Sequence, residues 1–188
     1  HPSRDMQDTF YLSDDDSLVM RTHTSPVQVR HMLTHTPPIR MICPGKVFRN
    51  EATDATHEAQ FFQLEGLMVD RDVSLAHMKG VLEYFFTRFF GGEVQVRFRP
   101  SFFPFVEPGV EVDMMIAPQE GNKLSGRWIE IMGGGMVHPN VLRAANIDPE
   151  VYQGFAFGMG IDRLGVLRYG IDDIRLMYNG DLRFVNQF

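Results

Sequence analysis

Apolar and polar positions alternate along several short stretches of this chain, as side chains on the two faces of a β-strand do. The alternation predicts strands over residues 39–43, 46–51, 59–70, 94–99, 110–116, 127–132 and 154–160. Helical spacing predicts a long helix over 74–90 that stops at Gly91, and shorter helices over 25–36, 139–145, 149–152 and 162–169. Many strands with few helices between them predict an α+β fold: one domain over residues 1–188, an antiparallel β-sheet flanked by helices.

The segment AQFFQLEGLMVD (59–70) carries an amide and a carboxylate inside an apolar strand. Gln63 and Glu65 are two residues apart, so they share one face of the strand with Phe61. We expect the opposite face, with Phe62, Leu64 and Met68, to be the core face. The polar face then needs a partner other than plain solvent.

Local signals predict how two of the helices begin. Ser25 is expected to be an N-cap followed by Pro26, with Gln28 completing a capping box, and Pro37-Pro38 ends this helix. Asp162 is expected to cap the helix near the C-terminus.

A hairpin is predicted between residues 46–51 and 59–70, joined by the loop 52–58. It would bring Arg49 and Glu51 onto the sheet surface that carries Gln63 and Glu65. A guanidinium suits a phosphate because its planar fork grips two oxygens. Glu65 and Gln63 suit an ammonium group. The alternative is a solvated amphipathic hairpin with surface ion pairs of little energetic value.

The strand 154–160 (GFAFGMG) has one nearly bare face, formed by Gly154, Ala156, Gly158 and Gly160. Such a face indicates close approach by a ligand or by another backbone. The alternative is a set of core glycines under a helix.

Two further stretches are ambiguous by themselves. Phe103 and Phe105 in SFFPFVEPG are either the aromatic wall of a pocket or ordinary core residues. The run Gly133–Gly135 either cradles a ligand or makes a tight turn.

Composition narrows the class of protein. The chain has 188 residues, 44% of them apolar, with a net charge of −6 and no apolar run long enough for a bilayer. The negative charge argues against a chain that mainly grips nucleic-acid phosphates. The single cysteine, Cys43, is expected to be a small buried hydrophobe in a reducing cytoplasm. His1-Pro2-Ser3 is an unusual natural start, which indicates a fragment.

The sequence gives little support for a histidine metal site or a catalytic triad. His31 and His35 are four residues apart, but the helix stops at Pro37, so a surface or capping role is favoured over a metal site. No Ser-His-Asp set with a nucleophile elbow is recognisable.

Several segments together resemble a known family. GKVFRNEATDATHEAQFFQLEG resembles the second signature motif of class II aminoacyl-tRNA synthetases, and GFAFGMGIDRLGVLRYGIDDIR resembles the third. RTHTSPVQVRHM, FRPSFFPFVEPG, GGGMVHPNVL and NGDLRFVNQF are similar to the α subunits of bacterial-type phenylalanyl-tRNA synthetases. The resemblance implies activation of L-phenylalanine with ATP and Mg²⁺, then transfer to tRNA, in the cytoplasm and together with a β subunit in an α2β2 assembly.

The resemblance also implies roles for individual residues. Arg49 and Arg163 would be the catalytic arginines, with Arg49 on the α-phosphate. Phe61 and Arg163 would sandwich adenine. ATP would further be contacted by Glu51, His57 and Glu58. The amino acid's polar groups would be held by His23, Ser25, Gln63 and Glu65. Phe103 and Phe105 would wall the side-chain pocket, with Ala156 and Gly158 as its floor. Glu107 and Glu130 are candidates for the metal or the ribose.

Some expectations remain open within this resemblance. The family's N-terminal helical arm and interface helix are not recognisable, so this piece is not expected to charge tRNA alone. Gln7 occupies a position that varies near the family's pocket. A non-catalytic module that binds adenylate-like ligands is the main alternative, although it would be expected to lose Arg49 or Arg163. A purely structural subunit is disfavoured by the bare glycine face.

Overall fold

A computed structural model describes residues 9–12, 18–118 and 125–188. Gln7 and the acidic residues at 14–16 lie outside the described residues. The chain forms two compact units, which are described separately. Unit 1 comprises residues 1–24, 44–63 and 160–188; unit 2 comprises residues 25–43 and 64–159. The expectation of one domain over residues 1–188 stays a prediction.

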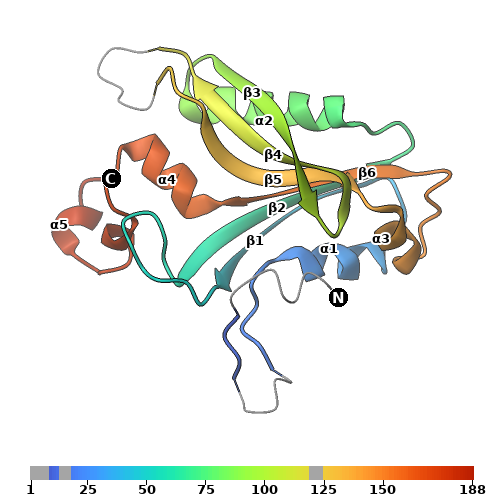
Figure 1. Ribbon diagram of the computed structural model, residues 1–188, viewed down its shortest axis with the longest axis horizontal. Helices are drawn as coiled ribbons and strands as arrows, with labels where there is room; N and C mark the ends of the chain where they lie inside the picture. The colour runs from blue at the N-terminus through green and yellow to red at the C-terminus, as the bar shows by residue number, and fades with distance from the viewer. Residues whose placement is uncertain (1–8, 13–17, 119–124) are drawn as a thin grey trace. The chain divides into compact units, whose positions relative to one another are not determined.

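A six-stranded sheet has the order β1-β2-β6-β5-β4-β3 (Figure 1). The strands are β1 (Ile39–Phe48), β2 (Gln60–Asp70), β3 (Val94–Phe103), β4 (Val106–Ile116), β5 (Ile129–Val137) and β6 (Gln153–Gly160). The ladders β3–β4, β4–β5 and β5–β6 are antiparallel. The predicted α+β fold, an antiparallel sheet flanked by helices, is confirmed.

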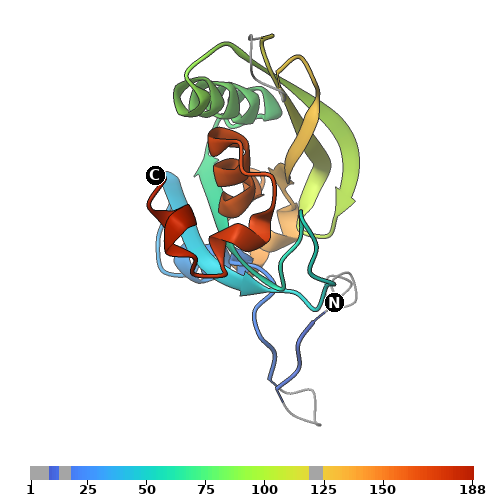
Figure 2. The same cartoon turned by 90° about the vertical axis from the view of Figure 1, so that its left-hand side faces the viewer.

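Helix α2 (Leu75–Phe90) follows its local sequence signals closely. The Ser74 side chain accepts from the His77 backbone N–H, and Gly91 ends the helix in the left-handed conformation with φ 74°. Met78, Leu82 and Phe86, spaced four apart, are its buried residues. This stripe packs α2 against β3 and β5 on one side of the sheet (Figures 1 and 2).

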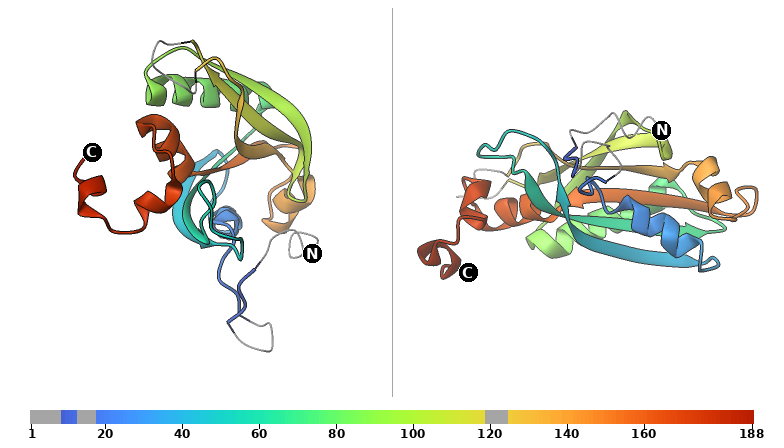
Figure 3. Two further views of the ribbon diagram at one scale, coloured as in Figure 1. Left: turned by 60° about the vertical axis from the view of Figure 1, so that its left-hand side comes forward. Right: turned by 90° about the horizontal axis from the view of Figure 1, so that it is seen from below.

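The other side of the sheet in unit 2 is covered by α1 (Ser25–Met32) and α3 (Pro139–Ala144) (Figure 3). Their apolar side chains join those of β1, β2 and β5 in one core cluster. Its buried members are Met32, Ile39, Leu67, Val69, Val137, Leu142, Ala145 and Ile147. Burial of these side chains is the main term that stabilises this layer.

Strand β1 is continuous through Pro44-Gly45, where two separate strands were expected. Proline removes a backbone donor, which an interior strand seldom tolerates, but β1 lies at the end of the sheet order. Beyond Pro44 the strand finds another backbone partner, because Phe48 N–H donates to the Arg21 carbonyl at 2.9 Å. The Pro-Gly pair therefore does not end the strand.

Three other strand boundaries differ from expectation. β3 and β4 are longer than predicted, and β5 runs through Gly133–Gly135, so this glycine run is neither a turn nor a loop. Residues 149–151 form a turn instead of the helix expected over 149–152. Glycine lowers strand propensity, but ladders on both sides of β5 supply its backbone hydrogen bonds.

The C-terminal part of unit 1 contains α4 (Ile161–Tyr169), the 3-10 helix η2 (Ile174–Met177) and α5 (Leu182–Val185). The last two were not predicted. Each short element is capped locally: the Asp173 side chain accepts from Arg175 N–H, and that of Asp181 accepts from Arg183 N–H. α4 has Gly160 at its N-cap and no side-chain cap, so the expected capping role of Asp162 is wrong.

Candidate functional site

The polar face of β2 is the buried face. Gln63 and Glu65 are only 6% and 3% exposed, whereas Phe62 on the opposite face is 41% exposed. The expectation that Phe62, Leu64 and Met68 form the core face is therefore wrong. Gly66 on that face is covered by Phe157 of β6, whose ring would come within 2.3 Å of an added Cβ.

The Glu65 carboxylate receives two short hydrogen bonds from α1. Ser25 Oγ donates to Oε1 at 2.7 Å, and Gln28 Nε2 donates to Oε2 at 2.6 Å. Burial raises the pKa of Glu65, and the hydrogen bonds from Ser25 and Gln28 oppose this rise. Both donors are neutral, so an ammonium group would add the charge complementarity that they do not supply.

This arrangement corrects the expected start of α1. Ser25 lies inside the helix, and both Ser25 and Gln28, predicted as a capping box, direct their side chains to Glu65. A buried carboxylate is costly without donors, so it outcompetes a helix terminus for them. Gln28 was missed as a site residue because its spacing from Ser25 already had a local explanation.

Glycines of β5 and β6 lie opposite each other in unit 2. Gly133 pairs with Gly158, and Gly135 pairs with Ala156. A Cβ on Gly133 would lie 2.7 Å from the Phe103 ring, so that ring rests directly on the glycine backbone. This glycine belongs to β5 and not to the predicted bare face of β6, so the pocket role of Phe103 stays a prediction.

Ala156 and Phe105 differ from Phe103 in their surroundings. Ala156 is partly buried and packs against the apolar cluster beneath α1 and α3. Phe105 is half-buried, and its backbone carbonyl accepts from His138 N–H at 2.9 Å. The pocket roles of Phe105, Ala156 and Gly158 stay predictions.

In unit 1 the hairpin after β1 positions Arg49. Its N–H donates to the Ala59 carbonyl at 2.9 Å, and its guanidinium carbon lies 5.0 Å from the centre of the Phe61 ring. Nη1 is 3.9 Å from Oε1 of Glu51, which is a long ion pair. Within the described residues, buried Nε has no hydrogen-bond partner. Burial lowers the pKa of Arg49, against the opposing effect of Glu51.

His23 lies beside this guanidinium. Its Nε2 is 3.5 Å from Arg49 Nη2, and its Nδ1 is 2.9 Å from Thr22 Oγ1. Burial, assisted by the charge of Arg49, lowers the pKa of His23 from 6.5 to about 4. At neutral pH the ring is therefore uncharged. Its Nε2 can then accept a hydrogen bond from Arg49, while Nδ1 forms a hydrogen bond with Thr22 Oγ1.

The loop between β1 and β2 is organised by Asp54. Its Oδ1 accepts from the backbone N–H groups of Thr56 and His57 at 2.7 and 2.8 Å. The backbone hydrogen bond from Thr56 is the largest effect that holds the pKa of Asp54 below its usual range, followed by the His57 side chain. Glu58 Oε1 accepts from Ala59 N–H at 3.0 Å. His57 and Glu58 therefore have partners at this loop, and their ATP roles stay predictions.

Asp54 was not among the predicted site residues. An Asp that binds the backbone two residues on is a known turn signal, so its local role was accessible from the pattern Asp54-Ala55-Thr56.

Arg163 lies in the first turn of α4 and is exposed. Its predicted sandwich with Phe61 stays a prediction.

The two metal candidates are far apart on the β4–β5 ladder. Val106, next to Glu107, pairs with Val137, whereas Glu130 pairs with Asp113. Val137 and Glu130 are seven positions apart on β5, which is roughly 20 Å along a strand. One ion would therefore bind at most one of the two, and the metal or ribose roles of Glu107 and Glu130 stay predictions. Glu130 Oε2 accepts from Arg99 Nη2 at 3.0 Å, and the described residues contain no group of three metal-binding side chains.

His31, His35 and Cys43, for which no catalytic role was expected, are exposed or partly buried. The rings of His31 and His35 stack 3.8 Å apart, and His35 is exposed. Cys43 is partly buried, less than expected for a core residue.

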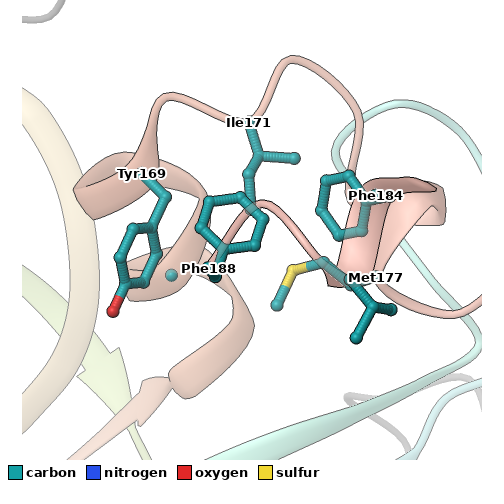
Figure 4. A pocket seen from close by; sticks show the side chains of 7 residues that line it. Tyr169, Ile171, Met177, Phe184 and Phe188 are labelled. Atoms are coloured by element: carbon teal, nitrogen blue, oxygen red, sulfur yellow. The ribbon is translucent and has the colours of Figure 1, made fainter. Parts of the chain in front are cut away.

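An apolar hollow of about 290 Å³ lies among α4, α5 and the C-terminal residue in unit 1. Figure 4 shows Tyr169, Ile171, Met177, Phe184 and Phe188 around it. It contains none of the predicted site residues and no charged side chain, so it does not suit phosphate or carboxylate chemistry.

Comparison with known proteins identifies the family of this chain. A family model described as "tRNA synthetases class II core domain (F)" matches residues 1–188. The chain belongs to this family. The segments that resemble the second and third signature motifs of class II synthetases lie in β1–β2 and in β6–α4 of this core domain.

Similar curated proteins are named phenylalanine–tRNA ligase alpha subunit. The chain is 56% identical over 192 residues to the protein of Alkaliphilus metalliredigens, and 54% and 55% identical to those of Clostridium botulinum and Clostridium perfringens. Each match covers 100% of this chain and 56% of the relative. This class II core domain therefore spans about half the length of the curated relatives it matches. Among its described residues, no helix has the length and apolar character needed to cross a membrane.

Proposed function

We propose that this chain is the catalytic module of a phenylalanine–tRNA ligase α subunit. It activates L-phenylalanine with ATP to phenylalanyl-adenylate and then passes the acyl group to the 3′ end of the cognate tRNA. The observation that carries the proposal is the buried Nε atom of the partly exposed Arg49 side chain, which has no hydrogen-bond partner within the described residues. A buried donor of this kind is costly unless an anion completes its hydrogen bonds.

Unit 1 provides the nucleotide-binding residues in this proposal. Arg49 binds the α-phosphate, which would satisfy its open donor and replace the long contact with Glu51. His23 is neutral, so it does not reduce the positive charge that Arg49 offers to the phosphate. Its contact with Arg49 Nη2 helps to orient the guanidinium. The contacts of ATP with Glu51, His57, Glu58, Phe61 and Arg163 follow from the family motifs.

Unit 2 provides the residues for L-phenylalanine. Glu65, held by Ser25 and Gln28, binds the ammonium group. The amino-acid roles of Gln63 and His23, which belong to unit 1, follow from the resemblance to the family. The ring packs against Phe103 and Phe105 over the strand surface of Ala156 and Gly158. The donors on Glu65 favour this assignment, because their hydrogen bonds oppose the rise in its pKa that burial causes and a cationic guest would supply the opposite charge.

The chemical step requires no side-chain nucleophile. A carboxylate oxygen of phenylalanine attacks the α-phosphorus, a new phosphorus–oxygen bond forms, and pyrophosphate leaves with the electrons of the broken bond. Alignment of two anions and stabilisation of the developing charge are the tasks of the protein. Mg²⁺ held mainly by phosphate oxygens, with Glu107 or Glu130 as one carboxylate ligand, would neutralise part of that charge.

The partners follow from the same proposal. A β subunit in an α2β2 assembly and tRNA are expected, and the reaction belongs in the cytoplasm. The net charge of −6 indicates that most of the grip on tRNA phosphates comes from other parts of the assembly.

Phenylalanine-dependent exchange of pyrophosphate into ATP tests this proposal. It would be measured with the complete α subunit plus β subunit and with residues 1–188 alone. Arg49→Lys retains charge but loses the fork, and we expect it to lower kcat by about 100-fold or more. The matched control is Arg88→Lys on α2, where the guanidinium only lies over Tyr84 at 5.7 Å. Absence of exchange in the complete enzyme, or equal rates for both variants, would contradict the proposal.

A further inference from the structure

The Asp162 carboxylate in unit 1 has an unusual position. It lies in the first turn of α4, is only 5% exposed, and does not cap its own helix. Oδ2 accepts from the backbone N–H of Phe62 at 2.5 Å, and Oδ1 accepts from the Tyr178 hydroxyl at 2.5 Å. A single side chain therefore connects β2 with α4 and with the residue that follows η2.

Both donors to Asp162 are neutral, and no ion pair to it occurs within the described residues. A buried carboxylate is strongly destabilised unless its oxygens are satisfied, so each of these two hydrogen bonds matters more than an exposed one. The N-terminal turn of α4 adds a favourable dipole. Burial, and then the hydrogen bond to Asp162, raise the pKa of Tyr178, so its hydroxyl keeps the proton that it donates.

The backbone that Asp162 holds carries proposed nucleotide contacts. Phe62 lies between Phe61 and Gln63 on β2, and the Phe61 ring is in contact with the Arg49 guanidinium at 5.0 Å. Asp162 itself directly precedes Arg163. The hydrogen bond from Phe62 N–H to Asp162 therefore links the immediate sequence neighbours of Phe61 and Arg163.

The Tyr178 segment has a second attachment in the same region. Ile174 N–H in η2 donates to the Ala55 carbonyl at 3.0 Å, inside the loop between β1 and β2. Asp54 and Glu58 of that loop also contribute to raising the pKa of Arg175, after the larger effect of Asp173. The segment 173–178 therefore forms hydrogen bonds both with the loop between β1 and β2 and with the Asp162 carboxylate.

We infer that Asp162 and Tyr178 are positioning residues that set the spacing between Phe61 and Arg163 for an adenine ring. The inference rests on the proposed function, because it assumes that these two side chains bind the base of ATP. Neither residue touches the nucleotide in this inference; Asp162 acts through the backbone of Phe62 and through its neighbour Arg163. Tyr178 acts by holding Asp162.

The test compares Tyr178→Phe with wild type in the complete αβ enzyme. The variant removes one oxygen and keeps the ring, so the fold is expected to persist. Removing a hydrogen bond to a buried carboxylate should raise the KM for ATP by about 10-fold, with the KM for phenylalanine within about twofold of wild type. The dissociation constant of a non-hydrolysable ATP analogue, measured by calorimetry, should rise by a similar factor. Tyr169→Phe is the matched control, since Tyr169 is 59% exposed and its ring contacts Phe188.

A second variant, Asp162→Asn, keeps the size of the side chain but turns one acceptor into a donor. It should weaken binding of the ATP analogue at least as much as Tyr178→Phe does. A purely structural role would instead lower the melting temperature and leave both Michaelis constants unchanged.

The outcomes separate this inference from the function on which it rests. A selective rise in the KM and the analogue dissociation constant for Tyr178→Phe supports the positioning role. Unchanged ATP constants, or equal changes for ATP and phenylalanine, overturn that role while wild-type exchange leaves the proposed function intact. A wild-type enzyme that neither binds the analogue nor exchanges pyrophosphate overturns both.

Discussion

Gln28 donates from Nε2 to Oε2 of Glu65 at 2.6 Å, and both side chains are buried. This contact joins the first helix to the middle of β2 across 37 residues of sequence. It orients the carboxylate through a neutral donor and opposes the rise in the pKa of Glu65 that burial causes.

Gln28→Leu removes this donor while it keeps similar volume. One oxygen of a buried carboxylate would lose this donor, a loss of about 1.5–3 kcal/mol. We expect the KM for phenylalanine to rise by about 10-fold or more, with little change for ATP. Steady-state exchange kinetics of the complete enzyme would measure this. Gln95→Leu, at an exposed position on β3, is the control and should change neither constant.

Glu65→Gln tests the raised pKa of the buried carboxyl. The folded chain holds this proton to higher pH than the unfolded chain, whose Glu ionises near 4.5. The free energy of unfolding of wild type should therefore fall, relative to Glu65→Gln, as pH rises above 4.5 and until the folded group ionises. Urea unfolding of both variants across this range gives the difference. A relative gain of wild-type stability over the same range would show that the pKa is lowered instead.

His23→Gln tests the opposite pH dependence in unit 1. The unfolded chain takes up a proton at His23 near 6.5, whereas folded His23 stays neutral down to about 4. Protonation therefore favours unfolding, and wild type should lose up to about 3 kcal/mol as pH falls from 6.5 to about 4. His23→Gln should lack this loss in the same urea titration. His35→Gln, at an exposed position, should retain it; equal pH profiles for all three chains would contradict the assignment.

Gly133→Ala tests the contact between β5 and the proposed aromatic wall. The new methyl group would lie 2.7 Å from the Phe103 ring, so that ring must move. We expect about 1–3 kcal/mol of lost stability and a KM for phenylalanine raised by about 10-fold, with ATP unaffected. Gly80→Ala is the matched control, because its Cβ would meet nothing within 4 Å on α2. There we expect unchanged kinetics and about 1 kcal/mol of added stability from helix propensity.

Much of the secondary structure was predictable because its causes are local. Helix α2 begins at Ser74 and ends at Gly91, where cap hydrogen bonds involve residues only three or four positions away. Alternation located all six strands, although their ends differ where cross-strand ladders extend them through Pro44 and through Gly133–Gly135. The chemistry of Arg49 and Glu65 was also visible as charges placed at strand spacing.

Sequence alone therefore determined the class of elements, the antiparallel sheet and the chemical types of the candidate groups. Tertiary structure decided which face of β2 is buried and which partners its carboxylates take. Ser25 and Gln28 looked like a helix cap, and Asp162 looked like another, yet all three satisfy buried groups far away in the chain. The reason is energetic. A desolvated carboxylate or backbone donor gains more from a hydrogen bond than does a helix end that can bond to water instead. Only the fold determines which groups lose their water.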